Sequence, residues 1–91
     1  MTENKNQLKI AYYIRTDIQH LPPVLALYAH LGGVIFTKNP DIYKYTRERH
    51  PDIQIKYVKK GREARRYCRR NDIRVIVYTG YQMIWYGYSV M

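Results

Sequence analysis

Hydrophobic and polar positions along this chain fall into two alternating kinds of block. Residues 8–14, 34–37 and 73–78 are runs of mostly β-branched, aromatic and other apolar side chains, whereas residues 53–58 alternate apolar with polar. Runs of this length and composition predict β-strands, and the alternating run is typical of a strand at a sheet edge. The stretches between these runs have helical spacing instead.

The first helical stretch begins at a pair of prolines. Pro22 and Pro23 fit the first turn of a helix, where a missing N–H is harmless, and not its interior. Gly32 and Gly33 predict its end, because glycine readily adopts the conformation that closes a helix. The apolar stripe of this helix is expected at Val24, Leu27, Tyr28 and Leu31.

Two further helices are indicated in the same way. Asn39 predicts an N-cap, with Pro40 in the first helical position, and Pro51 ends that helix. The third helical stretch, residues 61–70, is short and strongly basic.

Strands that alternate with short helices predict an α/β fold. We expect a three-layer, Rossmann-like domain over residues 8–82, with a four-stranded parallel sheet in the spatial order 3-2-1-4 and helices on both faces. Residues 1–7 are polar and are expected to form a disordered N-terminal tail, and residues 83–91 an aromatic C-terminal tail. A chain of 91 residues suits one small domain.

The positive charge of the chain is concentrated in one region. Nine of its 16 Lys and Arg residues lie between Lys56 and Arg74, against two acidic residues there, so this region carries about +7 of the net charge of +9. Predicted strands flank the basic helix, which indicates a folded cationic surface and not a basic tail. Nucleic acid, another polyanion or an anionic membrane surface is the kind of partner that such a surface attracts.

The basic helix places cations on one side and smaller residues on the other. Ala64, Tyr67 and Cys68 form a narrow stripe that is expected to face the sheet, which makes Cys68 a core residue. The arginines opposite repel one another, so a purely structural helix gains little from them. Either they contact an anion or they form a solvated charged face. The expected anion contacts are Lys59, Lys60, Arg62, Arg66, Arg69 and Arg70.

A second set of candidates lies where the predicted strands end. In an open parallel sheet, ligands bind outside the carboxyl ends of the strands, near the point where the strand order reverses. Structural roles compete at each position. Arg15 and Lys38 could be solvated charges, His20 could cap a helix, and Gly80 could serve turn geometry. The ligand-binding candidates at this edge are Arg15, Thr16, His20, Lys38, Thr79, Gly80 and Tyr81.

Several kinds of site are excluded by the residues present. One cysteine rules out an internal disulfide, and three scattered histidines do not give the spacing of a zinc site. The chain has no dinucleotide-binding glycine motif, P-loop, metalloprotease motif or nucleophile elbow. We therefore expect no metal, no cofactor and no catalytic residue. A polar start and the lack of a long apolar run predict a cytoplasmic protein, free or at the membrane surface.

The layout of residues 8–82 also resembles a known family. After the first strand come His20-Leu21 with Pro23, then Gly32-Gly33-Val34-Ile35, Pro51-Asp52 and the strand ending Val77-Tyr78-Thr79-Gly80-Tyr81. This layout is similar to the N-terminal half-domain of CDP-glycerol glycerophosphotransferases and UDP-sugar epimerase-like proteins of the GT-B fold. The ending of the fourth strand is its most telling part.

The resemblance implies that the chain is the acceptor-side, Rossmann-like part of a transferase acting in teichoic acid biosynthesis. Such a part would bind a phosphorylated polyol and would not be catalytic alone, with His20 and residues 79–81 lining an interdomain cleft. Two other interpretations stay open. The chain could be a stand-alone basic α/β module that binds nucleic acid, or an interaction domain that self-associates through Trp85, Tyr86 and Tyr88.

Overall fold

A five-stranded sheet forms the centre of the molecule. The structure is a computed structural model that describes residues 9–79 and 84–87. The strand order is β3-β2-β1-β4-β5, and the first four strands run parallel, which confirms the predicted α/β fold and its 3-2-1-4 order. The strands are β1 Ile10–Ile14, β2 Val34–Thr37, β3 Ile55–Tyr57, β4 Val75–Thr79 and β5 Ile84–Gly87.

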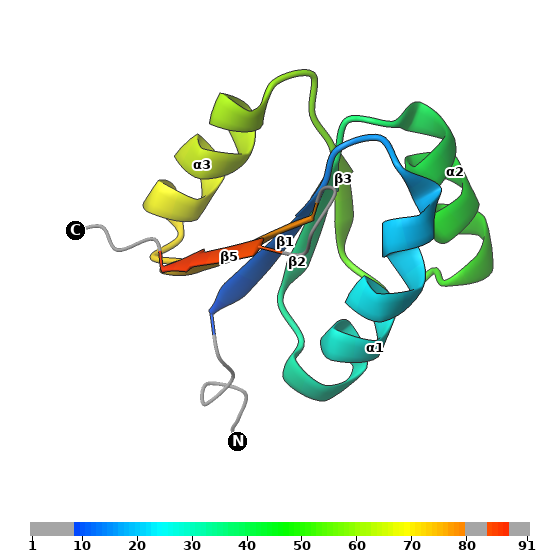
Figure 1. Cartoon of the computed structure of the whole chain (residues 1–91), viewed down its shortest axis with the longest axis horizontal. Coiled ribbons are helices and arrows are strands. Elements are labelled where there is room, and N and C mark those ends of the chain that lie inside the picture. The colour runs from blue at the N-terminus through cyan, green and yellow to red at the C-terminus, as the bar shows by residue number, and fades with distance from the viewer. Residues whose placement is uncertain (1–8, 80–83, 88–91) are drawn as a thin grey trace.

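Helices cover both faces of this sheet, as expected. α1 (Leu21–Leu31) and α2 (Pro40–Arg49) lie on one face, and α3 (Gly61–Arg70) lies on the other (Figure 1). A short 3₁₀ helix, η2 (Ile18–His20), precedes α1. The molecule therefore has three layers, and the sheet separates α3 from the other two α-helices.

Two hydrophobic cores lie on opposite faces of the sheet, because successive side chains of a strand point to opposite faces. Tyr12 and Ile14 of β1 belong to the core beneath α1 and α2, together with Val24 and Ile42 of those helices. The neighbouring Tyr13 belongs to the second core, which lies beneath α3. Strand β1 thus joins the two cores at the middle of the sheet.

The apolar stripe predicted for α1 needs one correction. The pattern predicts Leu27 within it, yet the Leu27 side chain is 36% exposed. Leu25 packs against the core instead, next to Tyr28. The helix begins at Leu21, which is buried. Its inward face continues through Val24, Leu25 and Tyr28, which follow Leu21 by three, four and seven positions.

Part of the segment expected as an aromatic tail is a strand. Ile84–Gly87 pairs antiparallel with β4, with Trp85 opposite Val77 and Tyr86 opposite Ile76. This strand supplies hydrogen-bond partners for the outer edge of β4, whose backbone groups would otherwise lie unpaired. The expected N-terminal tail, residues 1–7, lies outside the described residues.

Candidate functional site

Local backbone chemistry fixes both ends of α3. At its start, the Glu63 carboxylate accepts a hydrogen bond from the backbone N–H of Lys59 (3.3 Å), much as in a capping box. At its end, the backbone N–H of Ile73 donates to the carbonyl oxygen of Cys68 (2.8 Å). Asp72 there takes a left-handed conformation with φ of 59°, as in a Schellman motif. The one acidic side chain within α3 is therefore engaged with the backbone.

The inner face of α3 packs on the sheet. Ala64 and Cys68 are buried, and the half-buried Tyr67 ring lies edge-on to Phe36, with 5.4 Å between the ring centroids. The Lys56 ammonium lies 5.1 Å from the centroid of the same Tyr67 ring. Cys68 is thus confirmed as a core residue. Burial raises the pKa of its thiol to about 11, so the thiol stays protonated and unreactive near neutral pH.

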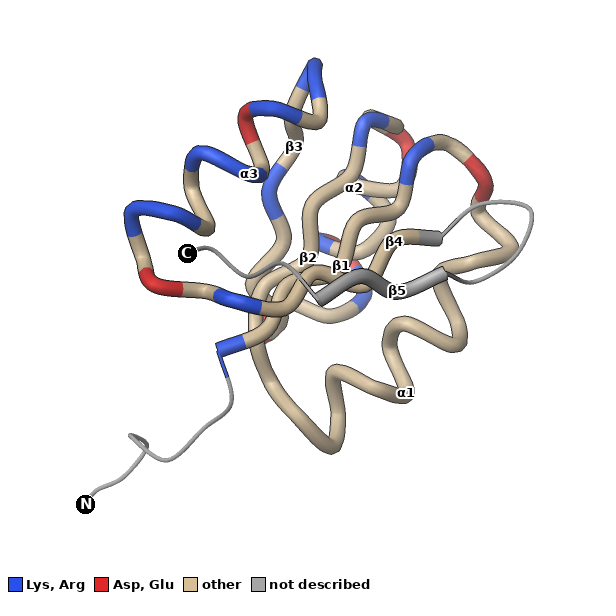
Figure 2. Tube along the Cα trace, turned by 60° about the vertical axis from the view of Figure 1, so that its left-hand side comes forward, with Lys and Arg blue, Asp and Glu red and all other residues tan. Residues whose placement is uncertain are grey.

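Four arginines form a cluster on the outer face of α3. Their spacing of i, i+3, i+4 and i+7 places them at the corners of a diamond on the helix surface. They line an open depression of about 280 Å³. No described residue gives any of these guanidinium groups an ion pair or a hydrogen bond, and Figure 2 shows how densely cations follow this helix. The arginine cluster consists of Arg62, Arg65, Arg66 and Arg69.

The arginine cluster shares Arg62, Arg66 and Arg69 with the anion contacts that the sequence suggests. Arg65 is missing from the predicted set, although it stands three positions after Arg62 and so shares its face. Arg70 belongs to the predicted set and is exposed, but it does not line the depression. Lys59 and Lys60 are exposed in the loop before α3. Helical spacing alone would have been enough to find Arg65.

The loops after β1 and β2 meet at the carboxyl edge of the sheet. The Asn39 amide donates to the backbone oxygen of Thr16 (2.9 Å), while its side-chain oxygen accepts from the backbone N–H of Asp41 (2.8 Å) and caps α2. The backbone N–H of Lys38 lies 3.3 Å from the carbonyl oxygen of Arg15. The structure therefore brings together three of the predicted edge residues, with Arg15 and Thr16 exposed and Lys38 half-exposed.

The remaining edge candidates have different outcomes. His20 occupies the N-cap position of α1, yet its imidazole makes no capping hydrogen bond. Its backbone N–H donates to the carbonyl oxygen of Asp17 (3.1 Å). Thr79 ends β4 opposite the last residue of β1, which places it at the same edge. Gly80 and Tyr81 lie outside the described residues, so their ligand role stays a prediction.

The carboxyl edge and the start of α3 approach each other around Tyr13. Tyr13 and Phe36 lie in the core beneath α3. Arg15 and Lys38 directly follow β1 and β2, whose last residues in this core are Tyr13 and Phe36. A Cβ on Gly61, the first residue of α3, would lie 3.5 Å from the Tyr13 hydroxyl oxygen. Burial raises the pKa of Tyr13, and the nearby positive charge of Arg15 opposes that rise.

Neither the residues that the structure describes nor comparisons with known proteins indicate a further kind of site. In residues 9–79 and 84–87, no group of three or more His, Cys, Asp or Glu could hold a metal ion, and no helix has the length and apolar character to cross a membrane. No family model, curated protein or solved structure matches the chain. The resemblance to GT-B transferases and the self-association through Trp85, Tyr86 and Tyr88 stay predictions.

Proposed function

We propose that this chain binds a phosphorylated polymer through the arginine cluster. The observation that supports this most is the set of four neighbouring guanidinium groups without a partner among the described residues. Like charges at helical spacing destabilise a helix by about 0.2–0.5 kcal/mol per pair. A bound polyanion removes that repulsion, and guanidinium groups pair with phosphate oxygens through two parallel hydrogen bonds.

The extent of the basic surface favours a polymer over a single small anion. Arg62 and Arg69 lie about 10 Å apart along the helix axis, because each residue adds about 1.5 Å. The exposed Lys59 and Lys60 extend the cationic surface beyond the start of α3. Several phosphates of one polymer are then bound together, and each additional contact raises the overall affinity.

The polymer that we propose is a polyol phosphate, bound as the acceptor of a transferase of which this chain is one part. The resemblance of residues 8–82 to the N-terminal half-domain of CDP-glycerol glycerophosphotransferase-like GT-B enzymes supports this choice, as does the Rossmann-like strand order. In this role the chain positions the acceptor and supplies no catalytic residue.

The placement of aromatic side chains also supports an acceptor recognised by its phosphates. The more exposed tyrosines of the described residues are Tyr45, which belongs to α2, and Tyr57. The Tyr57 ring lies 6.4 Å from that of Tyr43 of α2, between centroids, and so lies on the α2 side of the sheet. The two most exposed tyrosine rings among residues 9–78 therefore do not stack on a ligand bound at the arginine cluster.

Nucleic acid is the second candidate ligand, favoured by the same row of guanidinium groups. Proteins bind nucleic acid without sequence preference through Lys and Arg contacts to successive phosphates. Such binding weakens steeply with salt, with a slope of about −0.9 per neutralised phosphate of duplex DNA in a plot of log affinity against log salt concentration.

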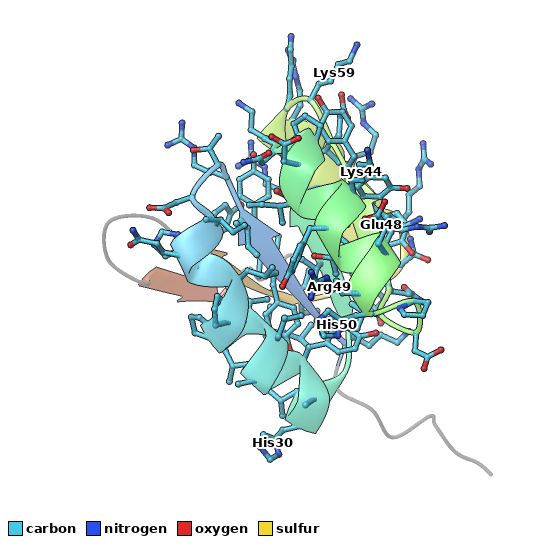
Figure 3. The ribbon with its side chains drawn as sticks, turned by 90° about the vertical axis from the view of Figure 1, so that its right-hand side faces the viewer. His30, Lys44, Glu48, Arg49, His50 and Lys59 are labelled. Atoms are coloured by element: carbon cyan, nitrogen blue, oxygen red, sulfur yellow. The ribbon has the colours of Figure 1, made fainter. Side chains whose placement is uncertain are left out.

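Binding titrations at several salt concentrations test the proposal. The ligands are a glycerol-phosphate oligomer, a short DNA duplex, single-stranded RNA and vesicles that contain an anionic lipid. The test variant is Arg62→Gln/Arg66→Gln. The matched control is Lys44→Gln/Arg49→Gln, which removes the same charge from α2, on the face that Figure 3 presents to the viewer. Circular dichroism first establishes that both variants are folded.

We expect the wild-type protein to bind the glycerol-phosphate oligomer most tightly. The test variant is expected to lose roughly fivefold to tenfold in affinity, whereas the control keeps the wild-type value. Tighter binding of DNA or RNA that depends on the same arginines would favour the second candidate. Equal affinities of the test variant and the control would show that the arginine cluster is a solvated face.

A further inference from the structure

Eight cations of the molecule follow one line, which runs along α3 to the carboxyl edge of the sheet. α3 starts at the carboxyl edge of the sheet, because β3 leads into it, and it ends at the opposite edge, where the chain turns into β4 (Figure 1). The arginine cluster lies along this helix, and Lys59 and Lys60 precede it. Beyond these lysines, at the same edge, are Arg15 and Lys38.

Tyr13 marks the place where the two parts of this line meet. Its hydroxyl oxygen lies beneath the first residue of α3, at 3.5 Å from the position that a Cβ on Gly61 would take. Tyr13 is the last residue but one of β1, so this approach places the end of β1 beside the first turn of α3. The arginine cluster and the carboxyl edge are therefore neighbours, although they lie far apart in the sequence.

Two further cations near this line have partners. The Lys56 ammonium lies against the Tyr67 ring at 5.1 Å. Arg74, past the end of α3, pairs with Asp72 at 3.2 Å. A polymer that crossed α3 would leave the helix after the arginine cluster, on the side where Lys56 lies against Tyr67. A polymer that runs along α3 meets further exposed cations instead, at Lys59 and Lys60.

We infer that the phosphorylated polymer lies lengthwise along α3 and that one of its ends reaches the carboxyl edge of the sheet, beside Arg15 and Lys38. This inference rests on the proposed function, and it adds the path and the position of the polymer end. Ligands of open parallel sheets bind outside the carboxyl ends of the strands. The end of the polymer therefore lies at the place where such a fold usually binds its ligands. The two sets of candidates, on the helix and at the edge, then belong to one binding surface.

A length series of glycerol-phosphate oligomers, from one phosphate to about eight, tests this path. The ligands are titrated against the full chain and three double variants, all to Gln and all exposed or half-exposed positions. The cluster variant is Arg65→Gln/Arg66→Gln, and the edge variant is Arg15→Gln/Lys38→Gln. The control, Lys44→Gln/Arg49→Gln, removes equal charge from α2. Circular dichroism and urea denaturation confirm that each variant folds.

The expected result separates the variants by ligand length. The cluster variant is expected to bind every oligomer more weakly, by roughly fivefold, because each must contact the arginine cluster. The edge variant is expected to bind the shortest oligomers as the wild type does and the longest about fivefold more weakly. The control variant is expected to match the wild type at every length.

The path of the polymer and the proposed function would be overturned by different results. An edge variant that binds all lengths as tightly as the wild type, or all lengths equally weakly, would overturn the lengthwise path and leave the arginine cluster as the binding site. A wild-type protein that binds no oligomer, or a cluster variant that equals the control, would overturn the proposed function itself.

Discussion

Gly33 joins α1 to β2 in a conformation that glycine adopts far more easily than other residues, with φ of 110°. A Cβ at this position would collide with the backbone oxygen of Ile10, whereas Gly32, with φ of 72°, has open space around it. We expect Gly33→Ala to lower the free energy of unfolding by about 3 kcal/mol and Gly32→Ala by about 1 kcal/mol. Urea denaturation measures both losses. Equal losses would contradict the close approach at Gly33.

Thr46 and Thr37 are both fully buried, but their hydroxyl groups differ in hydrogen bonding. The Thr37 hydroxyl accepts from the backbone N–H of Asn39 (3.1 Å), whereas no described residue bonds to that of Thr46. An unpartnered buried hydroxyl costs about 1–3 kcal/mol. We expect Thr46→Val to raise the free energy of unfolding by about 1 kcal/mol and Thr37→Val to lower it by a similar amount. Chemical denaturation measures both changes in the free energy of unfolding. A Thr46→Val variant that is less stable than the wild type would contradict the prediction.

At the scale of a single element, α3 carries charge that works against its own stability. Arg66 has like-charged neighbours at Arg62, Arg69 and Arg70, each three or four positions away. We expect Arg66→Gln to raise the free energy of unfolding by about 0.5 kcal/mol in low salt, and added salt to stabilise the wild type more than this variant. Thermal denaturation at two salt concentrations measures the effect, with Lys44→Gln as control. Identical salt responses of Arg66→Gln and the wild type would contradict it.

The helices and the parallel strands could be predicted because their signals are local. Asn39 caps α2 as the sequence predicts, and Gly32 and Gly33 close α1. Strand β5 could not be predicted in this way, since it depends on the open edge of β4, which exists only once the sheet has formed. The position of Leu27 depends similarly on how α1 is turned by the burial of Leu21.

The candidate site was predictable in its parts but not in its arrangement. Sequence spacing places cations on one face of α3, and the same spacing places Arg65 among them. The approach of Arg15 to the first turn of α3 is a tertiary feature. It follows from the central place of β1 in the sheet and from the packing of Tyr13 beneath Gly61.

At the scale of the whole molecule, buried acidic groups such as those of Tyr12 and Cys68 make stability sensitive to high pH. Burial raises the pKa of Tyr12 from 10.0 to about 12 and that of Cys68 from 9.0 to about 11. Both groups are neutral in the folded state, and unfolding lets them ionise at lower pH. The ionisation of these groups therefore leaves the free energy of unfolding unchanged below about pH 9. As the pH rises toward 12, it lowers the free energy of unfolding by about 3 kcal/mol for each group.

Urea denaturation at pH 8 and at pH 11 measures this loss, with Tyr12→Phe as the comparison. The variant lacks the hydrogen bond from the Tyr12 hydroxyl to the Gly32 oxygen (2.9 Å), so we expect it to be less stable at pH 8. Its stability is expected to fall less than that of the wild type as the pH rises. Equal falls would mean that the Tyr12 phenol ionises alike in the folded and unfolded chains.

The charge of the molecule is distributed unequally between its two faces. α3 carries five arginines and one glutamate, whereas α1, on the opposite face, contains no Lys, Arg, Asp or Glu (Figure 2). An uneven charge of this kind gives the protein an electric dipole, and the field of a polyanion exerts a torque on it from a distance. A protein that binds such a polyanion through α3, as we propose, would then arrive with this helix leading, and fewer collisions would be unproductive than if the same net charge were spread evenly.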